Sequence, residues 1–258
     1  MNERVALTRD GPVAFIDIRR PERHNALDAE TAEAFLERCR ELENADGVRA
    51  VVLAGQGASF GVGGDLTELQ TGGPRAARNI IAPLHEAIAL LVRLDAPVIA
   101  KLRGIVAGGS MSLGLGCDLA VASEQTRFSF AYSNVGTTAD LGGSWYLPRL
   151  VGLRNAMQIA LLNETIGAHQ ALALGLVNKV VLDDQLDAEV DALAHKLAAG
   201  PTKALGRMKR LLRMSGMNGL DCHLAVECAT FIECARTADF REAIDAVLGK
   251  RVPIFGGK

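Results

Sequence analysis

Aromatic residues are scarce in this sequence. They make up 4% of its 258 residues, although hydrophobic residues as a whole make up 49%. So low an aromatic content argues against a tight aromatic cage around a flat ligand. The hydrophobic content is nevertheless enough for one large core with a small appended lobe.

Charge of one sign is not concentrated in any segment. The net charge is -2, with acidic and basic residues mixed along the chain, so we expect no nucleic-acid partner. No apolar run approaches the ~20 residues that a membrane span needs, so we expect no membrane association. Residues 1–4 are polar and run into a strand-like segment, and we therefore expect no signal peptide.

Cysteine pairs of the CxxC type are also missing. The chain has five cysteines, an odd number, and is too long to need disulfides for stability. We therefore expect reduced thiols in a cytoplasmic protein. The zinc-peptidase pattern HExxH is absent as well, and we expect no metal site.

What is present is an alternation of strands, glycine-rich segments and helices, which is typical of an α/β core. Asp28 can cap a helix whose apolar residues recur at helical spacing. Beyond about Asp184 the strand patterns stop. Strands are predicted at residues 5–8, 13–18, 48–54, 97–102 and 118–122, and the late helices at residues 186–199, 202–214, 220–235 and 239–248. We therefore divide the chain into a core at residues 1–195 and a helical region at residues 196–258.

Two glycine-rich loops, at residues 61–65 and 104–109, each end where a helix begins. They match neither the Walker pattern nor GxGxxG, and Ser112 is one residue short of a nucleophile elbow. Helix N-termini leave backbone amides unpaired, so two such amides converging on one point would form an oxyanion hole. Spacing alone leaves a second interpretation open, in which the glycines only permit tight turns.

Several short motifs follow one another along the chain, at residues 20–27, 59–66, 97–100, 104–109, 117–118, 142–152, 175–177 and 250–255. In these motifs, and so along nearly its whole length, the chain resembles the enoyl-CoA hydratase/isomerase (crotonase) superfamily. The resemblance implies a spiral of strand–strand–helix turns, a C-terminal helical trimerisation region, and homotrimers or dimers of trimers. It also implies an acyl-CoA thioester substrate whose carbonyl meets the amides of Gly64 and Gly109. No tightly bound cofactor is implied, because coenzyme A enters as part of the substrate.

The resemblance does not by itself determine the reaction. Hydratases of the family use two glutamates, and Ser112 and Tyr132 stand at the matching positions, so hydration by that route is disfavoured. Asp140 stands where family isomerases, including the phenylacetate-pathway ring-epoxide isomerase, carry a proton-shuttling aspartate. A single carboxylate beside an oxyanion hole can move a double bond by proton transfer. Alternatively, Asp140 is only a turn residue.

His85 suggests a competing chemistry, which is dehalogenation by an aspartate nucleophile or thioester hydrolysis. It lies on an apolar helix face, where 4-chlorobenzoyl-CoA dehalogenases carry a water-activating histidine next to a nucleophilic aspartate. The sequence departs from those enzymes at Tyr132, where they have tryptophan. His85 can equally be a hydrogen-bonded core residue, and the whole chain can be a non-catalytic acyl-CoA-binding subunit.

The resemblance predicts two sets of site residues, but it leaves the acyl chain unidentified. Variable loops such as residues 67–79 are expected to form the walls of the acyl pocket. Catalytic roles are predicted for Asp140, Gly64, Gly109, His85 and Tyr132. Contacts with the substrate or its coenzyme A are predicted for Arg23, Ala26, Val62, Asp65, Leu66, Val106, Gly108, Ser112 and Gly136.

Overall fold

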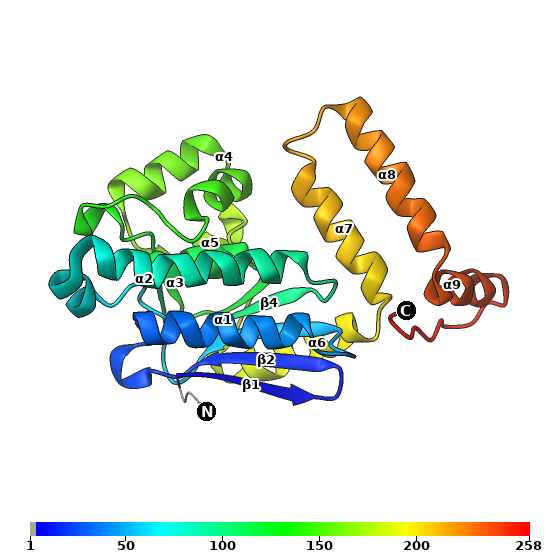
Figure 1. Ribbon diagram of the computed structural model, residues 1–258, viewed down its shortest axis with the longest axis horizontal. Helices are drawn as coiled ribbons and strands as arrows, with labels where there is room; N and C mark the ends of the chain where they lie inside the picture. The colour runs from blue at the N-terminus through cyan, green and yellow to red at the C-terminus, as the bar shows by residue number, and fades with distance from the viewer. Residues whose placement is uncertain (1–3) are drawn as a thin grey trace.

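The computed structural model describes residues 4–258 and has a central six-stranded sheet (Figure 1). Only the first pair, β1 and β2, is antiparallel, and the other neighbours are parallel. In spatial order the strands are β1 (Val5–Asp10), β2 (Val13–Ile18), β3 (Ala50–Gly55), β4 (Val98–Leu102), β6 (Leu119–Ser123) and β9 (Lys179–Val181). A second sheet contains β5 (Ile105–Ala107), β7 (Arg127–Ser129) and β8 (Ile166–Gly167).

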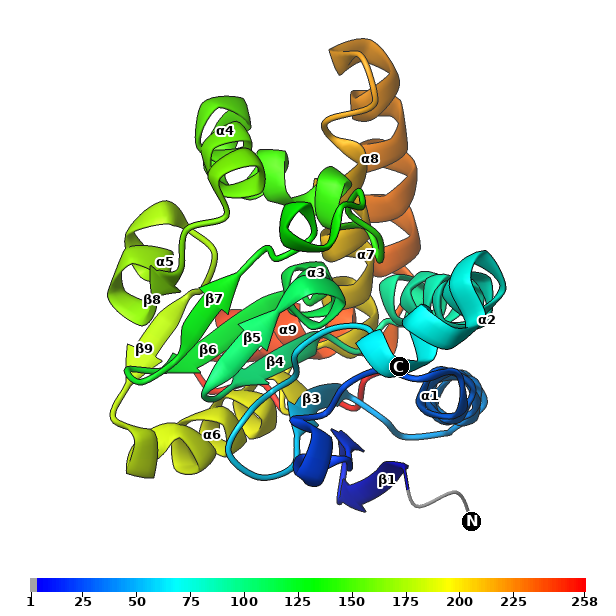
Figure 2. The ribbon, with the colours of Figure 1, turned by 90° about the vertical axis from the view of Figure 1, so that its left-hand side faces the viewer.

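Helices cover both faces of the large sheet. Figure 2 shows α6 on one side of it and α3 on the other. The helices are α1 (Ala29–Glu43), α2 (Leu66–Arg93), α3 (Gly108–Gly116), α4 (Gly143–Leu162), α5 (Ala168–Leu174), α6 (Leu186–Ala198), α7 (Thr202–Met214), α8 (Leu220–Ala235) and α9 (Ala238–Leu248).

The strand β3 shows why the sheet is buried on both faces. Its residues alternate between two cores: Val51 and Leu53 pack into the core under α1 to α4, and Val52 packs into the core under α6. All three side chains are fully buried. A continuous apolar run is what a strand with two covered faces requires, which confirms the strand predicted from this segment.

The α/β class, the spiral with its C-terminal helices and the five predicted strands are confirmed. The Asp28 cap is confirmed too, since its Oδ1 accepts a hydrogen bond of 2.8 Å from the Thr31 N–H. The predicted boundary between residues 195 and 196 falls inside α6, which packs on the sheet along its length.

The loop predicted at residues 67–79 is wrong. This segment is helical and forms the first part of α2, with one interruption at Gly73, where φ is 52° and ψ is -135°. Pro74 follows, and a proline can continue as a first-turn residue of the helix beyond the kink. The second glycine loop also holds a short strand, β5, that the sequence did not suggest.

The last three helices lie to one side of the body in Figure 1. No residue of α8 is buried, and its exposed apolar side chains include Leu224 and Phe231. The five cysteines lie in the described part of the chain and are free thiols. Among residues 4–258, no helix is both long and apolar enough to cross a membrane.

One buried ion cluster fastens α7 to the core. Asp118, immediately before β6, accepts hydrogen bonds of 2.9 Å from Lys209 Nζ and from Arg213 Nη2. Its Oδ2 also accepts the Val98 N–H at 2.9 Å. The side chains of Asp118 and Lys209 are 12% and 10% exposed. The pKa of Lys209 is lowered by burial, which Asp118 opposes. The carboxylate therefore compensates two cations that would otherwise be buried alone.

We expect Asp118→Ala to lower the free energy of unfolding by about 3 kcal/mol, because it leaves Lys209 and Arg213 without their counter-ion. Urea denaturation measures the change. Glu233→Gln is the matched control, because the Arg207–Glu233 pair is solvent-exposed at Glu233 and is worth at most about 1 kcal/mol. Equal stability losses in the two variants would contradict the anchoring role of Asp118.

Candidate functional site

The two glycine loops lie against each other. A short parallel bridge joins Gly61 to Val106, with the Gly61 carbonyl accepting the Ala107 N–H at 2.9 Å. Further along, a Cβ on Gly63 would lie only 3.0 Å from the nitrogen of Gly109. The backbones can approach this closely only because no side chain stands between them.

The amide of Gly64 points away from Leu27, which lies beside it in a short parallel bridge. The flanking groups, the Gly63 carbonyl and the Asp65 N–H, both bond to Leu27, at 2.8 and 2.9 Å. The Gly63 carbonyl and the Gly64 N–H belong to the same trans peptide, in which C=O and N–H point to opposite sides, so the Gly64 N–H faces away from Leu27. Gly109 is the second residue of α3, where helical N–H groups have no partner within the helix. Among residues 4–258, the structure records no acceptor for either amide.

Ser110 holds the loops together, and sequence reasoning missed it. Its hydroxyl oxygen accepts the Gly63 N–H at 3.1 Å, and the side chain is fully buried. A side chain on Gly61 would overlap this hydroxyl. Only the small polar residue next to Gly109 in the sequence could have suggested this role.

Arg20, also missed, supports the first loop from behind. Its guanidinium donates to the Ala26 carbonyl at 2.6 Å and pairs with Asp28 and Asp65 at 3.1 and 3.2 Å. Its side chain is 7% exposed, so the charge is compensated within the protein. The buried Asn25 donates to the Ser59 carbonyl at 2.7 Å and ties the same segment to the loop.

The side chain of Asp65 is engaged inside the protein rather than presented to a ligand. Its Oδ1 accepts the Thr67 and Glu68 amides at the start of α2, and its Oδ2 accepts from Arg20. These bonds lower the pKa of the carboxyl, although burial opposes them. We therefore assign this side chain to helix capping.

Asp140 reaches the same place from the segment before α4. Its Oδ1 lies 3.5 Å from where a Cβ on Gly109 would be, so the carboxylate sits beside the second amide. Tyr132 donates a short hydrogen bond to that oxygen, and Ser112 Oγ lies 2.8 Å from the Tyr132 hydroxyl. The structure therefore brings together Gly64, Gly109, Ser112, Tyr132 and Asp140.

Burial shifts the acid–base properties of this group. It raises the pKa of Asp140, against the Tyr132 hydrogen bond and the positive charge of His85 when that ring is protonated. The pKa of Tyr132 is raised by burial and by the nearby Asp140 carboxylate. Asp140 is consequently a stronger base than an ordinary aspartate, while Tyr132 stays protonated.

His85 is exposed, so the alternative of a core histidine is wrong. It nevertheless borders the site, because its Nε2 accepts the Leu141 N–H at 3.2 Å. An accepting Nε2 carries no proton, which places the proton of the neutral ring on Nδ1. In this arrangement neither ring nitrogen has a free lone pair.

The other predicted contact residues surround the loops at different depths. Ala26, Val106 and Gly108 are buried, and Val62 is half-buried. Arg23, Leu66 and Gly136 are exposed. Three of these predicted contact residues are therefore accessible to a ligand from solvent, and three are not.

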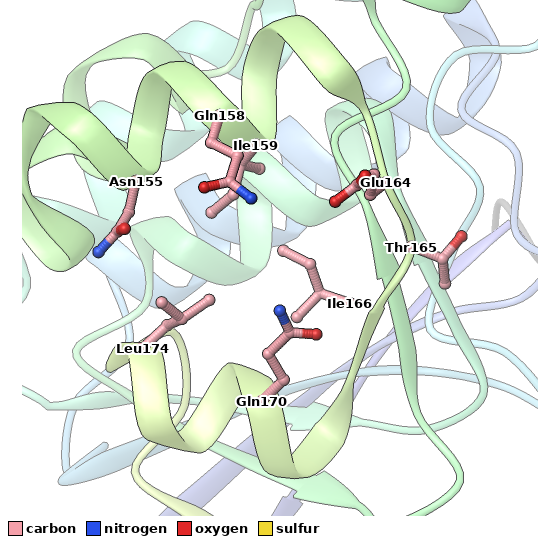
Figure 3. Close-up of a pocket in the computed structure, with 8 residues that line it drawn as sticks. All are labelled: Asn155, Gln158, Ile159, Glu164, Thr165, Ile166, Gln170 and Leu174. Atoms are coloured by element: carbon pink, nitrogen blue, oxygen red, sulfur yellow. The ribbon is translucent and has the colours of Figure 1, made fainter.

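Of two hollows in the surface, one lies beside these residues and the other lies away from them. A depression of about 90 Å³ lies between α4 and α5. Figure 3 shows that polar side chains such as Gln158 and apolar ones such as Ile166 line it together, and none of the predicted site residues is among them. An apolar cavity of about 350 Å³ begins at Gly142 and Ile88, one helical turn along α2 from His85. The larger, apolar cavity therefore adjoins the site, whereas the small depression between α4 and α5 does not.

Known proteins resemble this chain over nearly its full length. The chain is 34% identical to the 1,2-epoxyphenylacetyl-CoA isomerase of Escherichia coli K12 over 250 residues, which are 95% of each chain. It is 36% identical to 4-chlorobenzoyl coenzyme A dehalogenase-2 of an Arthrobacter species, covering 81% of this chain and 77% of that protein.

Among solved structures, an enoyl-CoA hydratase from Polaromonas sp. JS666 superposes with a TM-score of 0.92 at 35% identity, covering 97% of this chain and 99% of that one. The family model for enoyl-CoA hydratase/isomerase matches residues 8–258. The chain therefore belongs to the enoyl-CoA hydratase/isomerase family, the crotonase superfamily of enzymes.

Proposed function

We propose that this enzyme is an acyl-CoA isomerase that moves a double bond from the 3- to the 2-position, or rearranges a conjugated acyl group. The observation that carries the proposal is the position of Asp140, a carboxylate of raised pKa whose Oδ1 lies beside Gly109. Similarity to the 1,2-epoxyphenylacetyl-CoA isomerase supports it. The reaction needs no resident cofactor, because coenzyme A arrives with the substrate.

The proposed reaction is a proton transfer in two steps. With the thioester oxygen held by the amides of Gly64 and Gly109, the Asp140 carboxylate removes a proton from the α carbon. The electron pair delocalises into the thioester, and the two amides stabilise the resulting enolate oxygen. Asp140 then returns its proton to the γ carbon, which shifts the double bond and regenerates the carboxylate.

Hydration is the less well supported reaction, although relatives named as hydratases are also similar. Adding water by the family's route takes two carboxylates. The two matching positions carry hydroxyls instead, Ser112 and Tyr132, and these bond to each other. Asp140 is then the carboxylate left for proton transfer.

A second candidate is aspartate-nucleophile chemistry, favoured by the similarity to a 4-chlorobenzoyl-CoA dehalogenase. Asp140 would attack an aryl carbon, expel halide and form an ester, and water activated by a histidine would cleave that ester. His85 is the available histidine, but its Nε2 is occupied by the Leu141 N–H. This bond would have to break before His85 could accept a proton from water.

We also propose a homotrimer or a dimer of trimers, assembled through residues 196–258. The supporting observation is that α8 has no buried residue while Leu224 and Phe231 are 51% and 65% exposed. Large apolar side chains that are exposed on one helix are typical of a protein–protein association surface.

Asp140→Asn tests the reaction. The amide keeps the size of the side chain but cannot take up a proton, so turnover of a 3-enoyl-CoA should fall by ~10² or more while binding persists. Stopped assays and calorimetry measure the two effects. Asp184→Asn is the control, since Asp184 is exposed and lies outside the site. Full activity in Asp140→Asn would refute the proposal.

His85→Ala separates the two candidates. In the isomerase His85 only holds the Leu141 peptide and takes no part in proton transfer, so turnover should persist after this change, at most with a reduced kcat. An aspartate-nucleophile enzyme given 4-chlorobenzoyl-CoA should instead expel chloride and stall as an aryl ester on Asp140, visible as a mass increase on the corresponding peptide. Appearance of that adduct would favour the second candidate over the isomerase.

The pH dependence follows from the raised pKa of Asp140. The carboxylate must be deprotonated to act as a base, so kcat/KM should decline as the pH falls through this pKa. Because the pKa is raised, the decline should begin at a higher pH than for an ordinary aspartate, near 3.9. An acid limb at or below that ordinary value would contradict the assignment.

Light scattering tests the assembly. We expect the mass of three or six chains at micromolar concentration. Leu224→Glu together with Phe231→Glu should lower that mass, because two charges would be placed on the apolar face of α8. A wild-type monomer would refute the proposed assembly.

A further inference from the structure

We infer that Ser112 and Tyr132 are positioning residues that hold the Asp140 carboxylate at a fixed place relative to the amide of Gly109. The two side chains together are called the Ser112–Tyr132 strut. The inference rests on the proposed role of Asp140 as the base. It goes beyond that role, because it assigns a task to the two hydroxyls at the positions where hydratases carry their glutamates.

The hydrogen bonds of the strut run in one direction. The Tyr132 hydroxyl donates to Oδ1 of Asp140, because a carboxylate can only accept. The Tyr132 oxygen is then free to accept from Ser112, whose Oγ lies 2.8 Å away. Both hydroxyls are thus committed to a chain that ends on one oxygen of the carboxylate. No hydrogen bond to Oδ2 is recorded among residues 4–258, so this oxygen is available for a substrate proton.

The surroundings leave the strut little freedom. Ser112 is fully buried and Tyr132 is 8% exposed. The ring of Phe130 packs edge-on against the Tyr132 ring, with centroids 5.0 Å apart. Gly143 borders Ser112 so closely that any side chain there would overlap the hydroxyl. Neither hydroxyl can turn to solvent for another partner, and a buried hydroxyl without a partner costs free energy.

One helix carries both parts of the arrangement. Ser112 lies three residues after Gly109 on α3, so the amide and the first hydroxyl of the strut are one helical turn apart. Because the helix is rigid, the strut sets the carboxylate relative to the amide. On the other side of Asp140, the Leu141 N–H is held by His85. The base is therefore fixed through both its side chain and its neighbouring peptide.

Tyr132 is better suited to positioning than to proton transfer. Its pKa is raised by burial and by the Asp140 carboxylate, so the phenolate is not formed readily. As a donor, it stabilises the charged form of Asp140 and keeps the pKa of that carboxyl from rising further. Removing the phenol hydroxyl should therefore raise the pKa of Asp140 and free its side chain to rotate.

The test compares Tyr132→Phe and Ser112→Ala with the wild-type enzyme. Carboxyl signals of ¹³C-labelled aspartate are titrated by NMR, and the Asp140 signal is identified by its loss in Asp140→Asn. We expect a higher pKa of Asp140 in Tyr132→Phe and a smaller rise in Ser112→Ala. Tyr146→Phe is the matched control, because Tyr146 is the other of the two tyrosines and its hydroxyl interacts with Arg213 instead.

Kinetics give a second readout. In Tyr132→Phe, kcat on a 3-enoyl-CoA should fall roughly 10- to 100-fold with little change in KM, since a hydrogen bond to a charged group is lost. The acid limb of the kcat/KM profile should move to higher pH. Near-UV circular dichroism checks folding. If Tyr132→Phe does not fold, the pKa of Asp140 in Ser112→Ala is the test, and it should be higher than in the wild-type enzyme.

An unchanged pKa of Asp140 in folded Tyr132→Phe would overturn the inference, and so would an unchanged pH profile. The NMR titration does not require turnover. If Asp140→Asn kept full activity, the proposed function would fail, yet the titration would still show whether the strut controls the carboxylate. The two failures are therefore distinguishable.

Discussion

The contact between Gly63 and Gly109 is the constraint on which the site depends. It brings together two backbones that begin at different strands of the large sheet, and it tolerates no side chain at Gly63. Ser110 bonds across the contact, and Arg20 with its two aspartates supports it from behind. These buried hydrogen bonds and ion pairs thus hold the two glycine loops at a fixed distance from each other.

The site combines the backbone amides of Gly64 and Gly109 with the partly buried carboxylate of Asp140. Burial alone would disfavour a charged Asp140, whereas hydrogen bonding from Tyr132 favours it, and burial is the larger effect. Such a balance suits a group that must both gain and lose a proton in one cycle. The cavity that begins at Gly142 and Ile88 exposes mainly apolar surface, which suits an apolar acyl group better than a charged one.

The sequence was most informative where a property is local. The apolar run of β3 and the cap at Asp28 depend on near neighbours, and both were predicted correctly. The glycine loops were recognisable from the residues alone, but their role, like that of Asp140, was predicted through family resemblance. Long-range partners were not predictable, because Arg20 meets Asp65 across 45 positions and Gly63 meets Ser110 across 47. The kink at Gly73 was mistaken for a loop, since glycine and proline give the same local signal in both.

That kink divides α2 into two separate parts. The part before Gly73 begins at the exposed Leu66, next to the first glycine loop, and the part after it carries His85 against Leu141. A change of direction at Gly73 uncouples their orientations, so substitutions before the kink need not displace the histidine behind it. The helix thus behaves as two independently oriented segments, of which only the later one is tied to the residue after Asp140.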